Sequence, residues 1–312
     1  MSLLSDYPAP GLTGGPASLP RGHGKPPSGG LALIAKRAES CAPVIHGFSS
    51  PRPLVQRLAI VLAVFVQIGA GFLPRFGIGV FVGDRSDAVR TLITPAGWAF
   101  AIWGPLFALS ILFALWQALP AQRNNALLAR IGWPAAIALA TQGVWSTYTQ
   151  LANLTFASVL IILVSLAGLL IVLRALVAAP GLSRAERIFV APAFSALAAW
   201  LTAASIVNIA AALKYHGFAG GDPWPLVTTA MVAIGSVIAA IAAWRVRGAP
   251  LYGLVFCWAL NAIRAAGGER HAEIGYAAIA GIVLVLAVTA WRLSQADNRR
   301  HWFGPQARPT LT

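Results

Sequence analysis

Eight stretches of mainly apolar residues follow one another from residue 55 onward, separated by short breaks rich in proline, glycine or charge. A helix needs roughly 20 apolar residues to cross the hydrocarbon core of a bilayer, and most of these stretches reach about that length. The pattern predicts eight transmembrane helices, over residues 55–73, 95–118, 132–150, 156–178, 188–213, 225–244, 249–266 and 274–293. We therefore expect an all-α membrane protein, a polytopic helix bundle.

The two ends of the chain differ from this apolar region. Residues 1–54 are crowded with proline, glycine and serine, and their one apolar run is too short to span a membrane. This composition predicts a disordered N-terminal tail. Residues 294–312 are polar and basic, and they are predicted to form a C-terminal tail.

The composition supports the membrane assignment and indicates an orientation. Hydrophobic residues make up 58% of the chain and charged residues 10%, whereas a soluble domain has about 45–50% and about 25%. There are 23 lysines and arginines against 9 acids, and 17 of the 23 fall on one predicted side of the membrane. The positive-inside rule then places both termini in the cytoplasm. We expect the membrane to be the cell (inner) membrane. Because the basic residues are spread over many short loops, a nucleic-acid partner is not expected.

The titratable residues argue against catalysis and ion coupling. All nine acids and all five histidines lie outside the predicted spans, whereas proton relays keep such groups at membrane depth. The two cysteines, Cys41 and Cys257, are far apart and indicate neither a disulfide nor a metal site. No nucleophile–base pair is visible. We therefore expect a protein that is not an enzyme, with no catalytic residues and no bound metal.

Tryptophan is unusually frequent, with 11 copies. Most of them fall near the predicted helix ends, as in the aromatic belt of membrane proteins. Trp98 and Trp116 are 18 residues apart, which places them on one face of a continuous α-helix. Trp103, Trp200 and Trp258 lie deeper. For these three, core packing and ligand contact are equally good explanations.

Amide and hydroxyl side chains are the other polar groups at membrane depth. Interhelical hydrogen bonding, worth about 0.6–2 kcal/mol each, is the expected role of most of them. Trp200 and Asn208 are eight residues apart, about 80° around a helix and about 12 Å along it, so both can border one cavity. The set comprises Gln67, Thr141, Gln142, Thr202, Ser205, Asn208 and Asn261.

Two motifs resemble the TspO/MBR family of tryptophan-rich sensory or translocator proteins. Residues 94–107, which include Trp98, Phe100 and Trp103, resemble its Pro/Trp/Phe signature, and residues 199–208 resemble its Ala-Trp…Asn pattern. A third and weaker resemblance covers residues 142–145 and 156–159, which correspond to one helix of the family and the start of the next. The resemblance covers about residues 55–214, as a five-helix unit, and leaves residues 215–293 as about three additional transmembrane helices. Trp98 and Trp103 are one residue closer than in the core family, and Leu160 or a neighbour replaces its intramembrane Asp, so the chain resembles a divergent branch.

The resemblance implies a five-helix bundle that forms a homodimer and holds a flat hydrophobic ligand, such as a porphyrin or haem, in an aromatic pocket. Carried over residue by residue, the pocket consists of Trp98, Phe100, Trp103, Trp145, Trp200 and Asn208. A sensory, regulatory or transport role follows. The alternative is a secondary transporter of a small solute, in which the three additional helices complete a pathway.

Overall fold

The computed structural model of this protein describes residues 51–218 and 224–304, all of which belong to one structural unit, Ser49–Thr312. The N-terminal tail predicted over residues 1–54 therefore lies almost entirely outside the described residues.

Each predicted apolar segment contains one long helix. Among the described residues these helices are α2 (Leu54–Ala70), α4 (Trp103–Ala118), α5 (Ala126–Leu151), α6 (Phe156–Ala178), α8 (Ala191–Tyr215), α9 (Trp224–Arg245), α10 (Pro250–Ile263) and α11 (Ala272–Ser294). In the described part of the chain, six helical segments are long and apolar enough to cross a membrane. They are the segments that contain α4, α5, α6, α8, α9 and α11. The apolar helix α2 is shorter, and α10 continues into a π-helix, Arg264–Gly268. The chain is thus a polytopic helical membrane protein.

Several short helices flank the long ones and were not predicted separately. They are the 3₁₀-helices η1 (Leu73–Phe76), η2 (Gly97–Ile102) and η3 (Pro120–Gln122), and the α-helices α3 (Val82–Ala88), α7 (Arg184–Phe189) and α12 (Ala296–Phe303). The helix α12 lies in the segment predicted as a basic tail. Its residues Asn298, His301 and Trp302 are buried, because α12 packs back on the bundle.

The prediction that Trp98 and Trp116 share one face is wrong. The Trp98 side chain is 44% exposed, whereas that of Trp116 is 8% exposed and stacks on Phe189 with ring centroids 5.5 Å apart. The cause is η2, since a 3₁₀-helix turns about 120° per residue and an α-helix about 100°. The interruption shifts the angular position of every residue that follows it.

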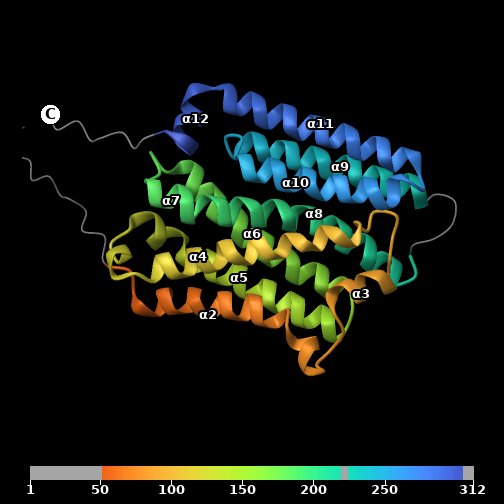
Figure 1. Ribbon diagram of the computed structural model, residues 1–312, viewed down its shortest axis with the longest axis horizontal. Helices are drawn as coiled ribbons and strands as arrows, with labels where there is room; N and C mark the ends of the chain where they lie inside the picture. The colour runs from red at the N-terminus through yellow and green to blue at the C-terminus, as the bar shows by residue number, and fades with distance from the viewer. Residues whose placement is uncertain (1–50, 219–223, 305–312) are drawn as a thin grey trace, which may run out of the picture. The chain divides into compact units, whose positions relative to one another are not determined.

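Five of the long helices close into a ring. The contacts run from α2 to α5, on to α6, α8 and α4, and from α4 back to α2. All five run side by side, as Figure 1 shows. The ring encloses the space in which the cavities described below are found.

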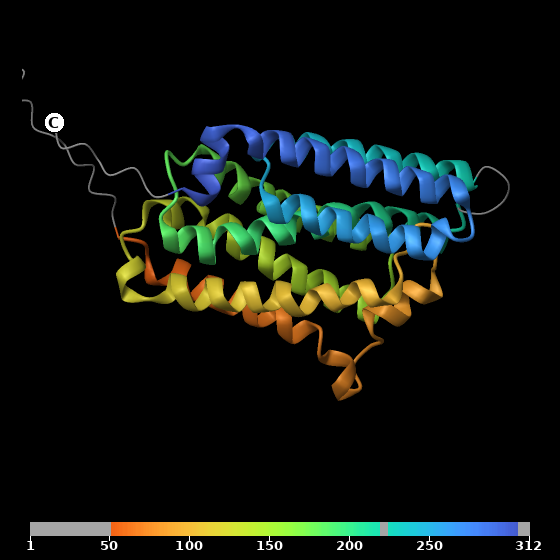
Figure 2. The same ribbon diagram turned by 45° about the horizontal axis from the view of Figure 1, so that its top comes forward.

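The three C-terminal helices pack on one side of this ring. The helix α10 lies against α8 and η2, while α9 and α11 pack on each other and on α10. Figure 2 shows these three helices along the upper side, with α2 and α4 along the lower side. The Thr202 hydroxyl of α8 lies 3.2 Å from that of Tyr252 in α10, a hydrogen bond between the ring and the outer helices.

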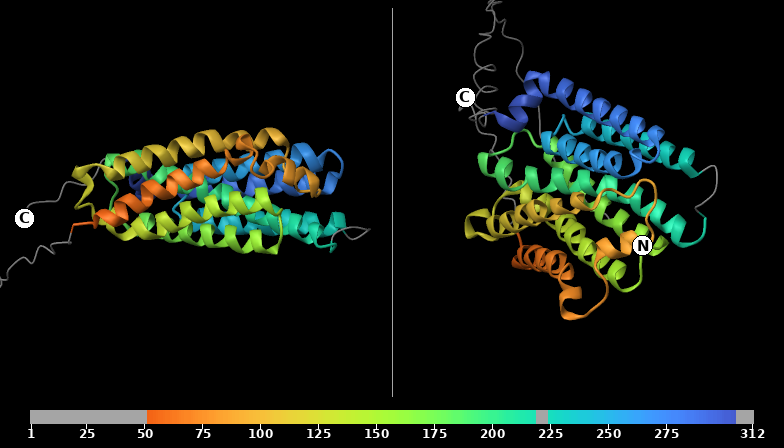
Figure 3. Two further views of the ribbon diagram at one scale, coloured as in Figure 1. Left: turned by 90° about the horizontal axis from the view of Figure 1, so that it is seen from below. Right: turned by 45° about the vertical axis from the view of Figure 1, so that its right-hand side comes forward.

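A glycine allows α2 and α5 to approach closely beside the enclosed space. A Cβ atom added at Gly143 would lie 2.7 Å from both the carbonyl oxygen and a side-chain methyl group of Val66. Such contacts are well inside van der Waals distance, so only glycine fits between the two helices here. Figure 3 shows the bundle from below, with α2 in orange among the other long helices.

At the end of the bundle that carries α7 and α12, one buried acid joins two helix starts. Ser183 and Glu186 form a capping box at the start of α7, with Ser183 N–H donating to Glu186 Oε2 at 2.8 Å. Asn125 caps α5 by accepting from Leu128 N–H, and its own Nδ2 donates to Glu186 Oε1 at 3.0 Å. Because Glu186 is hydrogen-bonded on both oxygens, its burial costs little.

Hydrogen bonds from side chains to backbone carbonyls hold helix α12 on the bundle, and the helix contains a buried histidine. The indole N–H of Trp302 donates to the Arg247 carbonyl at 3.2 Å, and Arg187 Nε donates to the His301 carbonyl at 3.1 Å. Burial and the positive charges of Arg247 and Arg187 lower the pKa of His301 to about 4, against an opposing hydrogen bond with the Leu176 backbone. His301 is therefore neutral at pH 7.

Candidate functional site

Three adjoining cavities lie within the helix ring, towards the end that carries α3. Their volumes are about 400, 50 and 30 Å³. Phe100 and Trp145 line all three, so the three cavities share parts of their walls. The largest falls in the size range of small-molecule sites, which are about 300–1,000 Å³.

The loop between α2 and α4 covers this end of the ring, and hydrogen bonds hold it there. The Val80 N–H and Arg85 Nη2 both donate to the Gln150 carbonyl, each at 3.0 Å. On the other side of the loop, the Ala96 N–H donates to the Ala262 carbonyl at 3.0 Å. These bonds place α3 over the cavities, and Val82 of α3 lines two of them.

Aromatic rings form much of the cavity wall. The Trp200 ring meets Phe100 and Trp103 edge to face, with centroids 6.3 and 6.1 Å apart. Trp103 also lies 5.2 Å from Phe107, one turn further along α4. Edge-to-face pairs hold aromatic side chains in fixed orientations. The five-helix ring therefore presents a pre-formed wall of aromatic side chains to the enclosed space.

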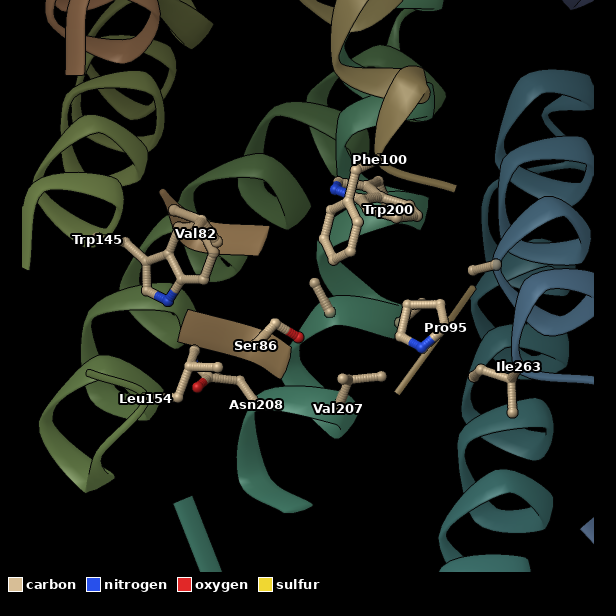
Figure 4. Close-up of a pocket in the computed structure, with 13 residues that line it drawn as sticks. Val82, Ser86, Pro95, Phe100, Trp145, Leu154, Trp200, Val207, Asn208 and Ile263 are labelled. Atoms are coloured by element: carbon tan, nitrogen blue, oxygen red, sulfur yellow. The ribbon is translucent and has the colours of Figure 1, made fainter. Parts of the chain in front are cut away.

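Three buried nitrogens of the wall have no hydrogen-bond partner in the described part of the chain. They are the indole nitrogens of Trp145 and Trp200 and the Nδ2 of Asn208. The other amide atom of Asn208, Oδ1, accepts from Ser158 Oγ at 2.9 Å. Figure 4 shows Trp145 and Asn208 on one side of the second cavity, with Pro95 and Ile263 opposite. Because buried N–H groups are normally paired, these three donors suit a ligand that offers acceptors.

A pair of glutamines forms the polar part of the largest cavity. Gln67 of α2 and Gln142 of the neighbouring helix α5 are hydrogen-bonded to each other, and both are buried. One amide atom of each, Gln67 Oε1 and Gln142 Nε2, has no further partner among the residues described. The pair therefore serves as an interhelical hydrogen bond and leaves one donor and one acceptor free beside the cavity.

Two carboxylates of α3, Asp84 and Asp87, line the mouth of the largest cavity. Both are exposed, and Asp87 forms an ion pair with Arg90. Among the described residues, no lysine, arginine or histidine lines this cavity. The site thus combines an aromatic interior, amide groups at mid-depth and acids at the mouth.

The structure brings five of the six predicted site residues together. Trp103 and Phe100 line the largest cavity with Trp145, while Trp200 and Asn208 line the second. Trp98 lies elsewhere. It packs edge to face on Trp258 at 4.8 Å, outside the cavities, and Trp258 Nε1 donates to the Ala99 carbonyl at 3.2 Å.

Sequence reasoning missed the residues that the α2–α4 loop contributes. Val82, Asp84, Ser86 and Asp87 are cavity-lining, yet the loop was read only as a connection between spans. The sequence predicts these acids outside the membrane spans, and the structure places Asp84 and Asp87 in the short helix α3, whose position over the cavity depends on the long-range bonds to Gln150. No local pattern in the sequence encodes those bonds.

Comparison with known proteins gives one match. A family model described as TSPO-like protein matches residues 54–291. The match runs from α2 into the last turn of α11, so it includes the three outer helices as well as the five-helix ring. Neither a curated protein nor a solved structure matches the chain.

Proposed function

This chain belongs to the TSPO-like protein family, and we propose that it binds a flat, largely apolar ligand within the five-helix ring. Tetrapyrroles are the ligand class that the family resemblance implies. The role would be sensory, regulatory or transport, without a covalent step.

One observation carries this proposal. Phe100 and Trp145 line all three cavities, and buried indole and amide nitrogens without partners in the described residues border the same space. Indole and phenyl faces stack favourably on a flat conjugated ring, while the few polar atoms orient its edge. A purely structural core has no use for unpaired buried donors, each of which costs about 1–3 kcal/mol.

The chemistry of the lining residues suits a tetrapyrrole. The indole N–H groups and the Asn208 amide offer donors to ring substituents, and Trp103, Trp145 and Trp200 offer faces and edges to the macrocycle. No histidine of the described part of the chain lines these cavities, so a haem would be held there by stacking and hydrogen bonds rather than by an axial imidazole.

The charge distribution supports an orientation for this site. The end that carries α7 and α12 is rich in arginine, and under the positive-inside rule it faces the cytoplasm. The cavities lie towards the opposite end, next to α3. The site would then open on the non-cytoplasmic side of the membrane.

Titration of the purified protein with protoporphyrin tests the proposal, with the ligand's own absorbance and emission as the readout. Trp103→Ala and Trp200→Ala are each expected to weaken binding about 5- to 20-fold, because each removes a ring from the wall. Trp98→Ala is the matched control. It removes an indole from the same segment as Trp103 but from outside the cavities, and it is expected to leave affinity unchanged. Unchanged affinity in both cavity variants would contradict the proposed site.

A further inference from the structure

We propose that the ligand of the helix ring is a cationic amphiphile, with a flat apolar part among the aromatic side chains and a positively charged group at Asp84 and Asp87. This inference rests on the proposed function and specifies the chemical class of the ligand.

The first observation is the charge at the mouth of the largest cavity. Within residues 51–218 and 224–304, Asp84 and Asp87 are the ionisable side chains that line it. Asp84 has no ion-pair partner among the described residues, and Asp87 pairs with Arg90, which does not line the cavity. Arg85 turns away and donates to the Gln150 carbonyl. A ligand at the mouth therefore contacts carboxylate oxygens and no cationic side chain.

The second observation is the aromatic wall directly inside those acids. Phe100, Trp103, Phe107 and Trp145 line the same cavity as the two carboxylates. The faces of such rings attract cations, and aromatic cages of this kind bind quaternary ammonium groups. Carboxylates and aromatic faces thus favour the same sign of charge on the ligand.

The third observation is that buried polar atoms continue the site inward. Gln67 and Gln142 are 2% and 4% exposed, and each has one amide atom without a partner in the described part of the chain. The Trp145 indole N–H is also buried and also has no partner there. These groups make the inner end selective for a ligand that carries both an acceptor and a donor, so the acids at the mouth are not an isolated surface cluster.

The surroundings of the mouth suit an amphiphile rather than a small hydrophilic cation. Gly71 and Phe81 line the cavity and bound a loop whose residues Phe72, Phe76, Ile78 and Val80 are exposed. This loop continues from helix α2, and Figure 2 shows it projecting from the bundle. Exposed apolar residues beside charged ones are typical of the membrane–water interface. A ligand with an apolar body and a cationic head concentrates in that zone.

A series of three probes that share one macrocycle tests this inference. The probes are protoporphyrin, which carries two carboxylates, its neutral dimethyl ester, and its diamide with two quaternary ammonium arms. Affinities are measured in a neutral detergent at about 20 mM and about 500 mM salt. The variants are the double substitution Asp84→Asn with Asp87→Asn and, as a control, Asp297→Asn, which removes an exposed acid from α12 at the opposite end.

We expect the cationic probe to bind about three- to tenfold more tightly than the ester, and the dicarboxylate to bind more weakly than the ester. High salt and the double variant should each remove most of this ranking, because exposed charge pairs are screened and individually weak. Asp297→Asn should preserve it.

Equal affinity of the three probes, or a preference for the dicarboxylate, overturns the charge preference while leaving binding within the ring intact. A ranking that persists in the double variant overturns the assignment to Asp84 and Asp87. Failure of all three probes to bind, or binding of all three that Trp200→Ala leaves unchanged, contradicts the proposed function itself.

Discussion

Replacement of Trp145 by alanine is expected to lower the affinity for protoporphyrin about 30-fold, the largest loss from any single side chain of the site. Trp145 lines all three cavities, so its removal enlarges and joins them and takes away one wall of each. It also removes a buried N–H that has no partner within the described residues. Stacking on an aromatic side chain is worth about 1–3 kcal/mol in nucleic-acid complexes, and a 30-fold change corresponds to about 2 kcal/mol.

Titration of the absorbance and emission of protoporphyrin measures this loss, and two further variants separate its causes. Trp145→Phe keeps an aromatic face but no N–H, and it should recover part of the affinity. Trp133→Ala is the matched control, since Trp133 belongs to the same helix α5 and is 46% exposed, outside the cavities. If Trp133→Ala weakened binding as much as Trp145→Ala, the ligand would lie on the outer surface of α5.

The second large effect concerns pH. Acidification from pH 7.5 to pH 5 is expected to destabilise the docking of α12 by about 2 kcal/mol through His301. The pKa of this group is about 4 in the folded protein and 6.5 ordinarily, because burial and then Arg247 and Arg187 disfavour its charged form. Between pH 6.5 and 4 the undocked state binds more protons than the docked state. Stability is therefore complete above pH 6.5 and is lost progressively below it.

Hydrogen–deuterium exchange of the peptide that contains residues 296–303, corrected for the intrinsic pH dependence of exchange, measures this change. The wild-type protein should lose protection in α12 at pH 5, and His301→Gln, which cannot titrate, should show no such loss. His271→Gln removes a half-buried histidine at the opposite end of the bundle and should behave as the wild type. Equal loss of protection in His301→Gln and the wild type would show that another group controls the docking.

The long helices were predictable because their signal is local. Apolar runs broken by proline, glycine and charge mark each of them, and the Trp200–Asn208 spacing on α8 correctly placed both side chains on one cavity. The depth of Trp200 and of the amide side chains within the bundle also follows from their positions in the apolar segments.

The failures share one physical cause, which is that they depend on contacts between distant segments. The position of Trp98 outside the cavities follows from η2 and from its packing on Trp258, some 160 residues away in the chain. The part that α3 plays in the site follows from bonds to Gln150, and the helix α12 follows from burial of His301 and Trp302 against the bundle. Periodicity within one segment carries none of this information.

The family match also extends further than the two motifs that indicated it. The motifs lie in α4, η2 and α8, whereas the match covers residues 54–291. Helix α10 contributes Ala259 and Ile263 to the second cavity. The outer helices therefore belong to the structure that surrounds the site, together with the five-helix ring.

Photolabelling locates the ligand most directly. A diazirine derivative of protoporphyrin is bound to the purified protein and irradiated, and the labelled peptides are mapped by mass spectrometry, with and without excess unlabelled protoporphyrin. Binding within the ring predicts competed labels in residues 81–87, 142–150 and 200–208, all of which contribute side chains to the cavity walls. Labels confined to exposed faces of α9 and α11, or labels that excess ligand does not displace, would contradict a site inside the five-helix ring.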